Sequence, residues 1–173
     1  EDLPDADSAG VVHILYGSNN GLMEGGQKWS QDSPYVLGNA EDADNFGAIL
    51  AAGDFNGDLC SDLAVGVPFE DGDLAEENMG AVNILYCDPN EGGLTATGNQ
   101  LWTQDSSGIS GNSEFADRFG ESLASGYFNN DQYEDLAIGV PHEDGNVDDV
   151  GYVHVLYGGP GGLSASGSQL IND

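Results

Sequence analysis

The sequence predicts an all-β protein built from repeated four-stranded sheets, and three observations support this fold class. First, the 173 residues include 27 glycines and many Asp and Asn residues, which indicate frequent turns. Second, the segments between these turns are short and rich in β-branched and aromatic residues, as strands are. Third, the chain resembles itself at a spacing of roughly 70 residues, which indicates a repeat architecture.

The first two strands of the expected unit each occur twice. We call them strand A, at residues 46–53 and 119–126, and strand B, at residues 62–68 and 135–141. Both pairs are separated by 73 residues, so the segments between A and B are in register as well. This constant offset predicts that the two copies fold alike.

The other two strands of the unit follow strand B. Strand C begins with glycine and ends with tyrosine in all three of its copies, and a turn ending in Gly-Leu comes after each copy. Strand D then carries Trp29 or Trp102 in two of its copies. The expected ranges are 10–16, 80–86 and 151–157 for strand C, and 27–31, 100–104 and 168–173 for strand D.

Four short strands in a repeat of this size are typical of a β-propeller blade. The strand order C-D, A-B-C-D, A-B-C-D gives ten strands, so the predicted fold is a partial β-propeller of about 2.5 blades. We expect a half blade with its connecting loop at 1–45, a complete blade with a metal loop at 46–118 and a second blade with a degenerate loop at 119–173.

The order of Phe-Gly, an acidic loop and Asp-Leu-Ala-hydrophobic-Gly-Val-Pro resembles the FG-GAP repeat of integrin α-subunit propellers and their bacterial and eukaryotic relatives. The resemblance covers essentially the whole chain, although the repeat is somewhat longer than the usual family unit. It implies a calcium-binding module outside the cell or at the cell surface, used for adhesion or protein recognition.

The integrin-like propellers close with seven blades, so this chain cannot form such a ring alone. We expect a protein partner, or other copies of the chain, to cover the open terminal blades. Two interpretations stay open: a piece of a longer propeller, or a structural subunit of a filament formed by non-closing contacts.

The segment between the first strands A and B predicts a calcium site. Asp54, Asn56, Asp58 and Asp62 place side-chain oxygens at positions 1, 3, 5 and 9, and Cys60 offers its backbone carbonyl at position 7. Calcium prefers six to eight oxygen ligands from a flexible loop. The spacing resembles the FG-GAP calcium loop and differs from the EF-hand, whose last carboxylate stands at position 12. The alternative is an Asx-rich turn that caps a hairpin.

The equivalent loop of the second blade has Tyr127 where the first ligand should be. Asn129, Asp131, the carbonyl of Tyr133 and Asp135 remain, so the sequence predicts either a weaker, water-completed site or an empty turn.

Cys60 lies in the metal loop and Cys87 follows strand C, at the same rim of an up-and-down blade. A disulfide between them is therefore allowed, and two free thiols are the alternative. An oxidised pair would support an extracellular location.

The opposite rim is also expected to be acidic, because the B–C and D–A connections are rich in Asp and Glu. These loops are candidates for partner contact or for extra cation sites, and solvated loops are the alternative. The acids are Glu41, Asp42, Asp44, Glu70, Asp71, Asp73, Glu76, Glu77, Glu143, Asp144, Asp148 and Asp149.

The charge balance limits the partners. Lys28 and Arg118 oppose 31 acidic residues, which gives a net charge of −29. Nucleic acid and anionic membranes need clustered basic residues, so both are disfavoured, whereas cations are favoured. No apolar run reaches the ~20 residues of a membrane span. Trp29 and Trp102 leave a carbohydrate partner open, although core packing is the alternative role for them.

No catalytic residues are predicted, and we expect a non-enzyme. His13 and His154 occupy the same position of strand C, where the remaining copy has Asn83, and this indicates a structural position. The sequence contains no nucleophile elbow, phosphate-binding loop or zinc-spaced histidine pair.

Overall fold

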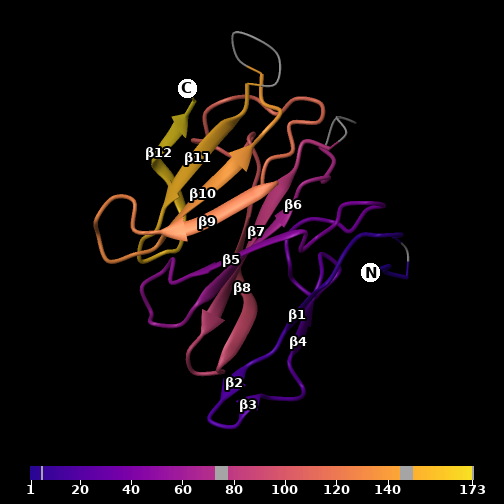
Figure 1. Ribbon diagram of the computed structural model, residues 1–173, viewed down its shortest axis with the longest axis vertical. Helices are drawn as coiled ribbons and strands as arrows, with labels where there is room; N and C mark the ends of the chain where they lie inside the picture. Colours follow the sequence, from indigo (N-terminus) through magenta and orange to yellow (C-terminus); the bar gives the residue numbers. More distant parts are fainter. Residues whose placement is uncertain (5, 73–77, 145–149, 173) are drawn as a thin grey trace.

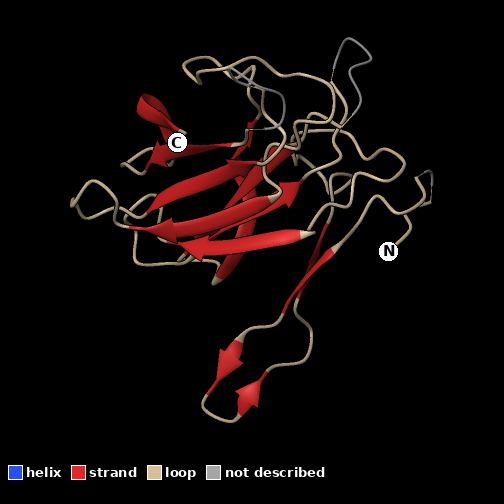
Figure 2. Cartoon of the chain, turned by 45° about the horizontal axis from the view of Figure 1, so that its top comes forward, coloured by secondary structure: helices blue, strands red, loops and turns tan. Residues whose placement is uncertain are grey.

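The structure is a computed structural model that describes residues 1–4, 6–72, 78–144 and 150–172. Twelve strands and no helix are present in these residues (Figures 1 and 2). The strands form two four-stranded antiparallel sheets and two small two-stranded sheets. The predicted all-β class and the four-stranded blades are therefore confirmed.

Each four-stranded sheet contains strands A to D in chain order, which is the up-and-down arrangement of a propeller blade. The first complete blade consists of β5 (Ile49–Gly53), β6 (Asp62–Val67), β7 (Ala81–Asp88) and β8 (Gly93–Trp102). The second consists of β9 (Ser122–Gly126), β10 (Asp135–Val140), β11 (Tyr152–Tyr157) and β12 (Ser164–Ile171).

The half blade differs from the prediction of two continuous strands. Its hairpin is divided into two pairs, β1 with β4 and β2 with β3, and the second pair projects from the molecule (Figure 2). Leu22 is 71% exposed there, whereas the equivalent Leu94 and Leu163 are buried against the preceding blade. None of the described residues gives this hairpin that support. The four strands are β1 (Val12–Ile14), β2 (Gly17–Ser18), β3 (Gly21–Leu22) and β4 (Gln27–Trp29).

The Phe-Gly pairs lie before strand A and not inside it, because β5 begins at Ile49 and β9 at Ser122. Phe46 and Phe119 are both buried. The glycines that follow them have φ angles of 88° and 90°, a left-handed conformation that turns the chain into the strand. The Phe-Gly pair is thus an element of the junction between blades.

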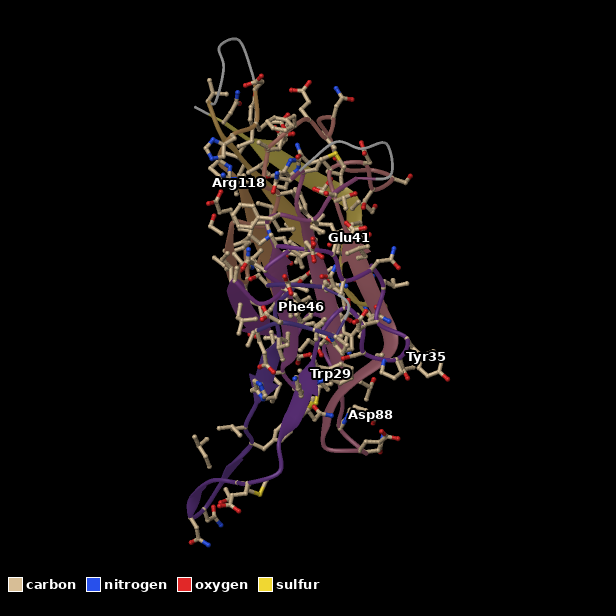
Figure 3. All side chains as sticks on the ribbon, turned by 90° about the vertical axis from the view of Figure 1, so that its right-hand side faces the viewer. Trp29, Tyr35, Glu41, Phe46, Asp88 and Arg118 are labelled. Carbon is tan, nitrogen blue, oxygen red and sulfur yellow. A yellow bond between two sulfur atoms is a disulfide. The ribbon has the colours of Figure 1, made fainter. Side chains whose placement is uncertain are left out.

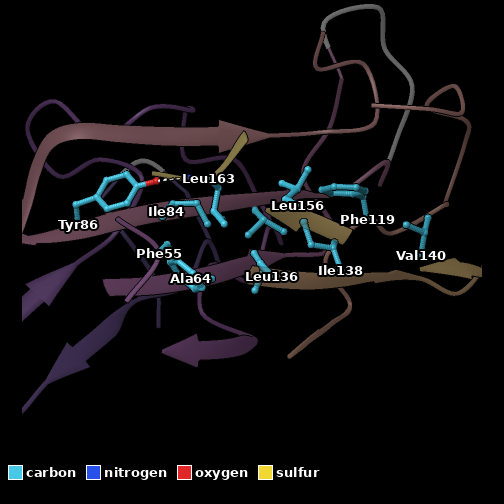
Figure 4. Close-up of a cluster of buried hydrophobic side chains, with 11 residues drawn as sticks. Phe55, Ala64, Ile84, Tyr86, Phe119, Leu136, Ile138, Val140, Leu156 and Leu163 are labelled. Atoms are coloured by element: carbon cyan, nitrogen blue, oxygen red, sulfur yellow. Dashed lines mark hydrogen bonds between the residues drawn. The ribbon is translucent and has the colours of Figure 1, made fainter. Parts of the chain in front are cut away.

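Two hydrophobic clusters fill the junctions between successive sheets. Alternate residues of a strand face opposite sides, so Ala64 of β6 joins one cluster and Val65 joins the other. Figure 3 shows Phe46 within the stack, and Figure 4 shows the cluster between the two complete blades. That cluster contains Phe55, Ala64, Val82, Ile84, Tyr86, Phe119, Leu136, Ile138, Val140, Leu156 and Leu163.

Candidate metal centre

The loop between β5 and β6 begins with a carboxylate that organises the backbone after it. Asp54 Oδ1 accepts hydrogen bonds from the N–H groups of Gly57 (2.8 Å) and Asp58 (3.0 Å), and Oδ2 accepts one from Leu59 (3.0 Å). Gly57 and Leu59 have φ angles of 76° and 69°, so the chain bends tightly around Asp54. One side chain thereby holds the first half of the loop.

The next two predicted ligands continue this pattern of turns. Asn56 Oδ1 accepts from the N–H of Asp58 at 2.9 Å, and Asp58 Oδ1 accepts from the N–H of Cys60 at 2.8 Å. The amide of Asn56 donates to Asp58 Oδ2 at 3.1 Å, which brings these two side chains together. Side-chain oxygens at positions 1, 3 and 5 therefore share one short loop.

The last predicted ligand, Asp62, is 1% exposed at the start of β6. Its two oxygens accept from the N–H groups of Phe55 (3.0 Å) and Cys87 (2.9 Å). Burial, with a smaller contribution from the neighbouring carboxylates of Asp58 and Asp54, raises the pKa of Asp62 to about 7. Because a cation would relieve both causes, the buried charge fits a metal ligand.

The described residues contain no group of three or more His, Cys, Asp and Glu side chains placed to hold a metal ion. Asp54, Asn56 and Asp58 are linked by hydrogen bonds, whereas Asp62 bonds to the backbone at the ends of the loop. The donor set is nevertheless entirely oxygen, which suits a hard cation such as calcium.

The second loop repeats the arrangement without its first carboxylate. Asn129 Oδ1 accepts from Asp131 N at 2.9 Å, and Asp131 Oδ1 accepts from Tyr133 N at 2.8 Å. Asp135 accepts from the N–H groups of Phe128 and Gly158, as Asp62 does from Phe55 and Cys87. At position 1, Tyr127 is 57% exposed and has no carboxylate to offer.

The first loop rests directly on the second blade. Its backbone carbonyls at Asp54 and Phe55 accept from the N–H groups of Glu134 and Gly159, both at 3.0 Å. A Cβ on Gly57 would lie 2.5 Å from the ring of Tyr133. An ion in the first loop would therefore stiffen a junction between blades as well as one hairpin.

Comparisons with known proteins agree with this arrangement. The FG-GAP repeat model matches residues 46–82 and 119–156, which run from the Phe-Gly pair into strand C of each complete blade. The chain contains two FG-GAP repeats. Strands A and B of both complete blades, with the loops between them, thus lie within FG-GAP repeats, and each match ends inside strand C.

Individual relatives include integrin α-subunits. Integrin alpha-4 of Xenopus laevis is 37% identical over 127 residues, which cover 73% of this chain and 11% of the relative. Integrin alpha-PS2 of Drosophila melanogaster is 31% identical over 148 residues, 83% of this chain and 10% of the relative. Human phosphatidylinositol-glycan-specific phospholipase D is 30% identical over 167 residues, 94% of this chain and 18% of the relative. The chain therefore spans less than a fifth of each relative.

A disulfide crosses the same rim of the first FG-GAP blade. It joins Cys60 in the loop to Cys87 near the end of β7, with the Cα atoms 5.7 Å apart. Since Cys87 N also donates to Asp62, the loop is held to strand C by one covalent bond and one hydrogen bond. Both cysteines of the chain are thus placed at the candidate metal loop.

The tryptophans of strand D serve the blade junctions. Trp29 and Trp102 are partly buried against the two clusters, and each indole N–H faces the Oε1 of the Gln two residues earlier, at 3.4 and 3.2 Å. Of the strand C positions compared above, Asn83 and His154 are buried, whereas His13 is exposed. Burial lowers the pKa of His154 to about 4, so it is neutral at pH 7.

The opposite rim of the FG-GAP blades contains buried acids, which the solvated-loop interpretation did not anticipate. Asp44 and Asp117 are buried, as is Glu143, and Glu70 is largely so. Burial raises the pKa of Asp44 and Asp117 to about 7 and that of Glu70 to about 8, and raises the pKa of Glu143 as well. The sequence contains a signal for these buried positions, because Asp44 and Asp117 are 73 residues apart, and so are Glu70 and Glu143. Asp73, Glu76, Glu77, Asp148 and Asp149 lie outside the described residues, as does Asp173 at the end of the last expected strand.

Among the described residues there is no helix with the length and apolar character that a membrane span requires.

Proposed function

We propose that this chain is part of a calcium-stabilised propeller that acts outside the cell in adhesion or protein recognition. The observation that carries the proposal is the oxygen-rich loop from Asp54 to Asp62, seated on the next blade and lying within an FG-GAP repeat. The similarity to integrin α-subunits supports a protein partner and a non-enzymatic role. The disulfide at this loop supports an oxidising, extracellular compartment.

Calcium would act first on the fold. It would be held by Asp54, Asn56, Asp58 and Asp62 with the carbonyl of Cys60, and would neutralise three carboxylates that otherwise repel one another. In the second loop the three side chains Asn129, Asp131 and Asp135 with the carbonyl of Tyr133 form a weaker set. The stiffened rim would then present a stable surface to a partner.

Calorimetric titration of the full chain with calcium tests this proposal. We expect a strong binding event that Asp58→Ala removes, while Glu24→Ala, which deletes an exposed acid beyond the loop, leaves it intact. Asp131→Ala should affect only a weaker event. The proposal fails if Asp58→Ala binds calcium as the unmodified chain does.

A second candidate function is that of a self-assembling subunit. It is favoured by a contact between blades that occurs at both junctions and whose elements are exposed on the second blade. At each junction a Phe-Gly pair packs on a glycine of the preceding strand C. Phe119 N donates to Met79 O at 2.8 Å, and a Cβ on Gly80 would lie 2.4 Å from Phe119 O. Phe46 N donates to Ala9 O at 2.7 Å, and Gly10 is equally close to Phe46.

A second contact joins the same blades. Tyr86 Oη accepts from Leu163 N at 2.9 Å (Figure 4). Gln100 Nε2 donates to Leu163 O at 3.0 Å. Tyr16 and Gln27 hold Leu94 in the same way, at 3.0 and 2.8 Å. At both junctions, a strand C tyrosine and a strand D glutamine thus form hydrogen bonds with the leucine of the Gly-Leu turn in the following blade.

The second blade carries the same elements, and no described residue of this chain occupies them as the Phe-Gly pair and the Gly-Leu turn do in the earlier junctions. A pocket of about 360 Å³ lies around Gly151, the equivalent of Gly80, with exposed apolar side chains at its edge. Tyr157 and Gln169 stand where Tyr86 and Gln100 stand. The exposed Leu22 of a second copy could bind to Tyr157 and Gln169 as Leu163 binds to Tyr86 and Gln100. The pocket is lined by Ser122, Gly139, Val140, Pro141, Val150, Gly151, Tyr152, Val153, Ile171 and Asn172.

Light scattering after size exclusion tests self-assembly. A concentration-dependent oligomer that Leu22→Asp dissociates, and that Tyr35→Asp at another exposed site leaves intact, would support it. A monomer at all concentrations would contradict it and leave the recognition module as the function.

A further inference from the structure

Each junction between blades contains a glutamine placed between two acids at the rim opposite the calcium loops. We call these sets the junction acid triads, and they occur twice with the same residue types. The first consists of Gln31, Asp44 and Glu70, and the second, 73 residues later at every position, of Gln104, Asp117 and Glu143.

The first triad brings three separate segments together. Gln31, from the end of strand D, is 3% exposed and donates from Nε2 to Glu70 Oε2 at 2.5 Å, across 39 residues. Asp44, from the segment before Phe46, is 1% exposed and accepts from the N–H of Glu41 through Oδ2 at 2.6 Å. Burial raises the pKa of Glu70, and the negative charge of Asp44 acts on it in the same direction.

The second triad repeats these contacts. Gln104 is 1% exposed, and its Nε2 donates to Glu143 Oε2. Asp117 accepts from the N–H of Glu114 through Oδ2 at 2.6 Å, as Asp44 does from Glu41. The carboxyl groups of Asp117 and Glu143 are in hydrogen-bonding contact. Two carboxylates this close repel each other unless a positive charge or a proton lies between them.

Both triads contain buried oxygen atoms that have no hydrogen-bond partner. Gln31 Oε1, Asp44 Oδ1 and Gln104 Oε1 are buried and accept no hydrogen bond. Each glutamine Oε1 shares a carbon with the nitrogen that contacts a carboxylate, so it belongs to the same cluster. Buried polar atoms are normally satisfied, and the same orphan in two independent junctions indicates a built feature.

The strong cations of the chain are engaged elsewhere. Lys28 pairs with Glu1 at 2.8 Å, and Arg118 pairs with Glu121 at 3.4 Å and lies over the ring of Phe69. Neither lysine nor arginine therefore supplies the positive charge for a triad.

We propose that each junction acid triad binds a divalent cation of the calcium type between its two carboxylates and the glutamine Oε1. A hard cation accepts carboxylate and amide oxygens together, with water or carbonyl groups completing the shell. A proton connects only two oxygens, whereas an ion contacts all the oxygens of a triad. The ion would join strand D of one blade to both ends of the A–B hairpin of the next.

Equilibrium dialysis of the full, chelator-stripped chain against radioactive calcium tests this site. The variant is Glu70→Gln with Glu143→Gln, because a glutamine there can pair with Gln31 or Gln104 through both amide atoms and so preserve the fold. We expect it to bind one ion fewer per junction than the unmodified chain. The control removes the same charge at exposed positions, with Glu24→Gln and Glu91→Gln, and should bind the full number.

Asp58→Ala separates this site from the loop site, since it should lose the loop ion and keep the junction ions. Unchanged stoichiometry in the Glu70→Gln, Glu143→Gln variant overturns the proposal. A carboxylic acid infrared band that persists at neutral pH in saturating calcium, and disappears in that variant, also overturns it, because the triads would then hold protons.

Discussion

Phe55 and Phe128 hold the same position in successive A–B loops, yet Phe55 is fully buried and Phe128 is 50% exposed. The difference arises because the loop of the first blade inserts Phe55 into the cluster it shares with the second blade. Phe128 belongs to neither hydrophobic cluster of the described residues. The candidate metal loop of the first blade thus also fills the junction with the second blade.

Replacing these two residues should have unequal effects on stability. Phe55→Ala should lower the free energy of unfolding by about 3–5 kcal/mol, because it leaves a cavity between two sheets. Phe128→Ala should change it by about 0.5 kcal/mol, as surface substitutions do. Urea unfolding followed by tryptophan fluorescence measures both, and equal losses would contradict the junction role of Phe55.

The disulfide should stabilise the chain by limiting the unfolded state. Cys60 and Cys87 are separated by 27 residues, and closing a loop of that size is worth about 3–4 kcal/mol by chain entropy. The Cys60→Ser, Cys87→Ser variant should therefore unfold at lower urea concentration, and dithiothreitol should do the same to the unmodified chain but not to the variant. An effect of reductant on the variant would show that it acts elsewhere.

The fold could be predicted from sequence to the level of strands and blades, because the period, the turn residues and the strand residues all agree. The eight strands from β5 to β12 correspond to two copies of A to D. The position of Phe46 and Phe119 could not be predicted, since a buried aromatic residue next to strand residues looks like part of the strand. Only the contact with the preceding blade sets the strand's start at Ile49 and Ser122.

Of the two kinds of candidate site, one could be predicted from the sequence and the other could not. The loop from Asp54 to Asp62 could be found by spacing, because its donors lie within nine residues. The junction acid triads could not, because Gln31 and Glu70 are 39 residues apart and meet only after two blades pack. Recurrence of the polar residues at a fixed offset was the available signal, but it does not indicate which segments meet.

Glu70 should make the stability of the calcium-free chain depend on pH. Burial raises its pKa to about 8, above the usual 4.5, so the folded state binds the proton more tightly than the unfolded state. The resulting stabilisation is complete below pH 4.5 and is lost as the pH rises through 8. Glu70→Gln has no such proton, so in chelator at pH 8 it should be more stable than the unmodified chain by about 1–2 kcal/mol.

Denaturant titrations of both proteins from pH 4.5 to 8 measure this difference. It should grow in favour of Glu70→Gln with rising pH, and Glu91→Gln, at an exposed position, should show no such trend. A difference in unfolding free energy that stays constant over this pH range would show that folding does not raise the pKa of Glu70.

Alanine substitutions should have different effects at Gly80, which lies in the junction between the two complete blades, and at Gly151, its equivalent beside the pocket of the second blade. A Cβ at Gly80 would lie 2.4 Å from Phe119 O, whereas a Cβ at Gly151 would have Pro141 O at 3.0 Å as its nearest neighbour. Both glycines have positive φ angles, 83° and 70°, so alanine costs about 1 kcal/mol of backbone strain at either. Gly80→Ala also forces two blades apart, and should therefore lose about 2 kcal/mol more than Gly151→Ala in the monomer.

In a self-assembled state, Gly151→Ala should have an effect that it lacks in the monomer. If a second copy docks on the open blade, Gly151→Ala should weaken association at concentrations where the unmodified chain is oligomeric, with little further loss of monomer stability. Light scattering and urea unfolding on the same samples separate the two effects. Association that is unaffected by Gly151→Ala would place the contact between copies away from this pocket.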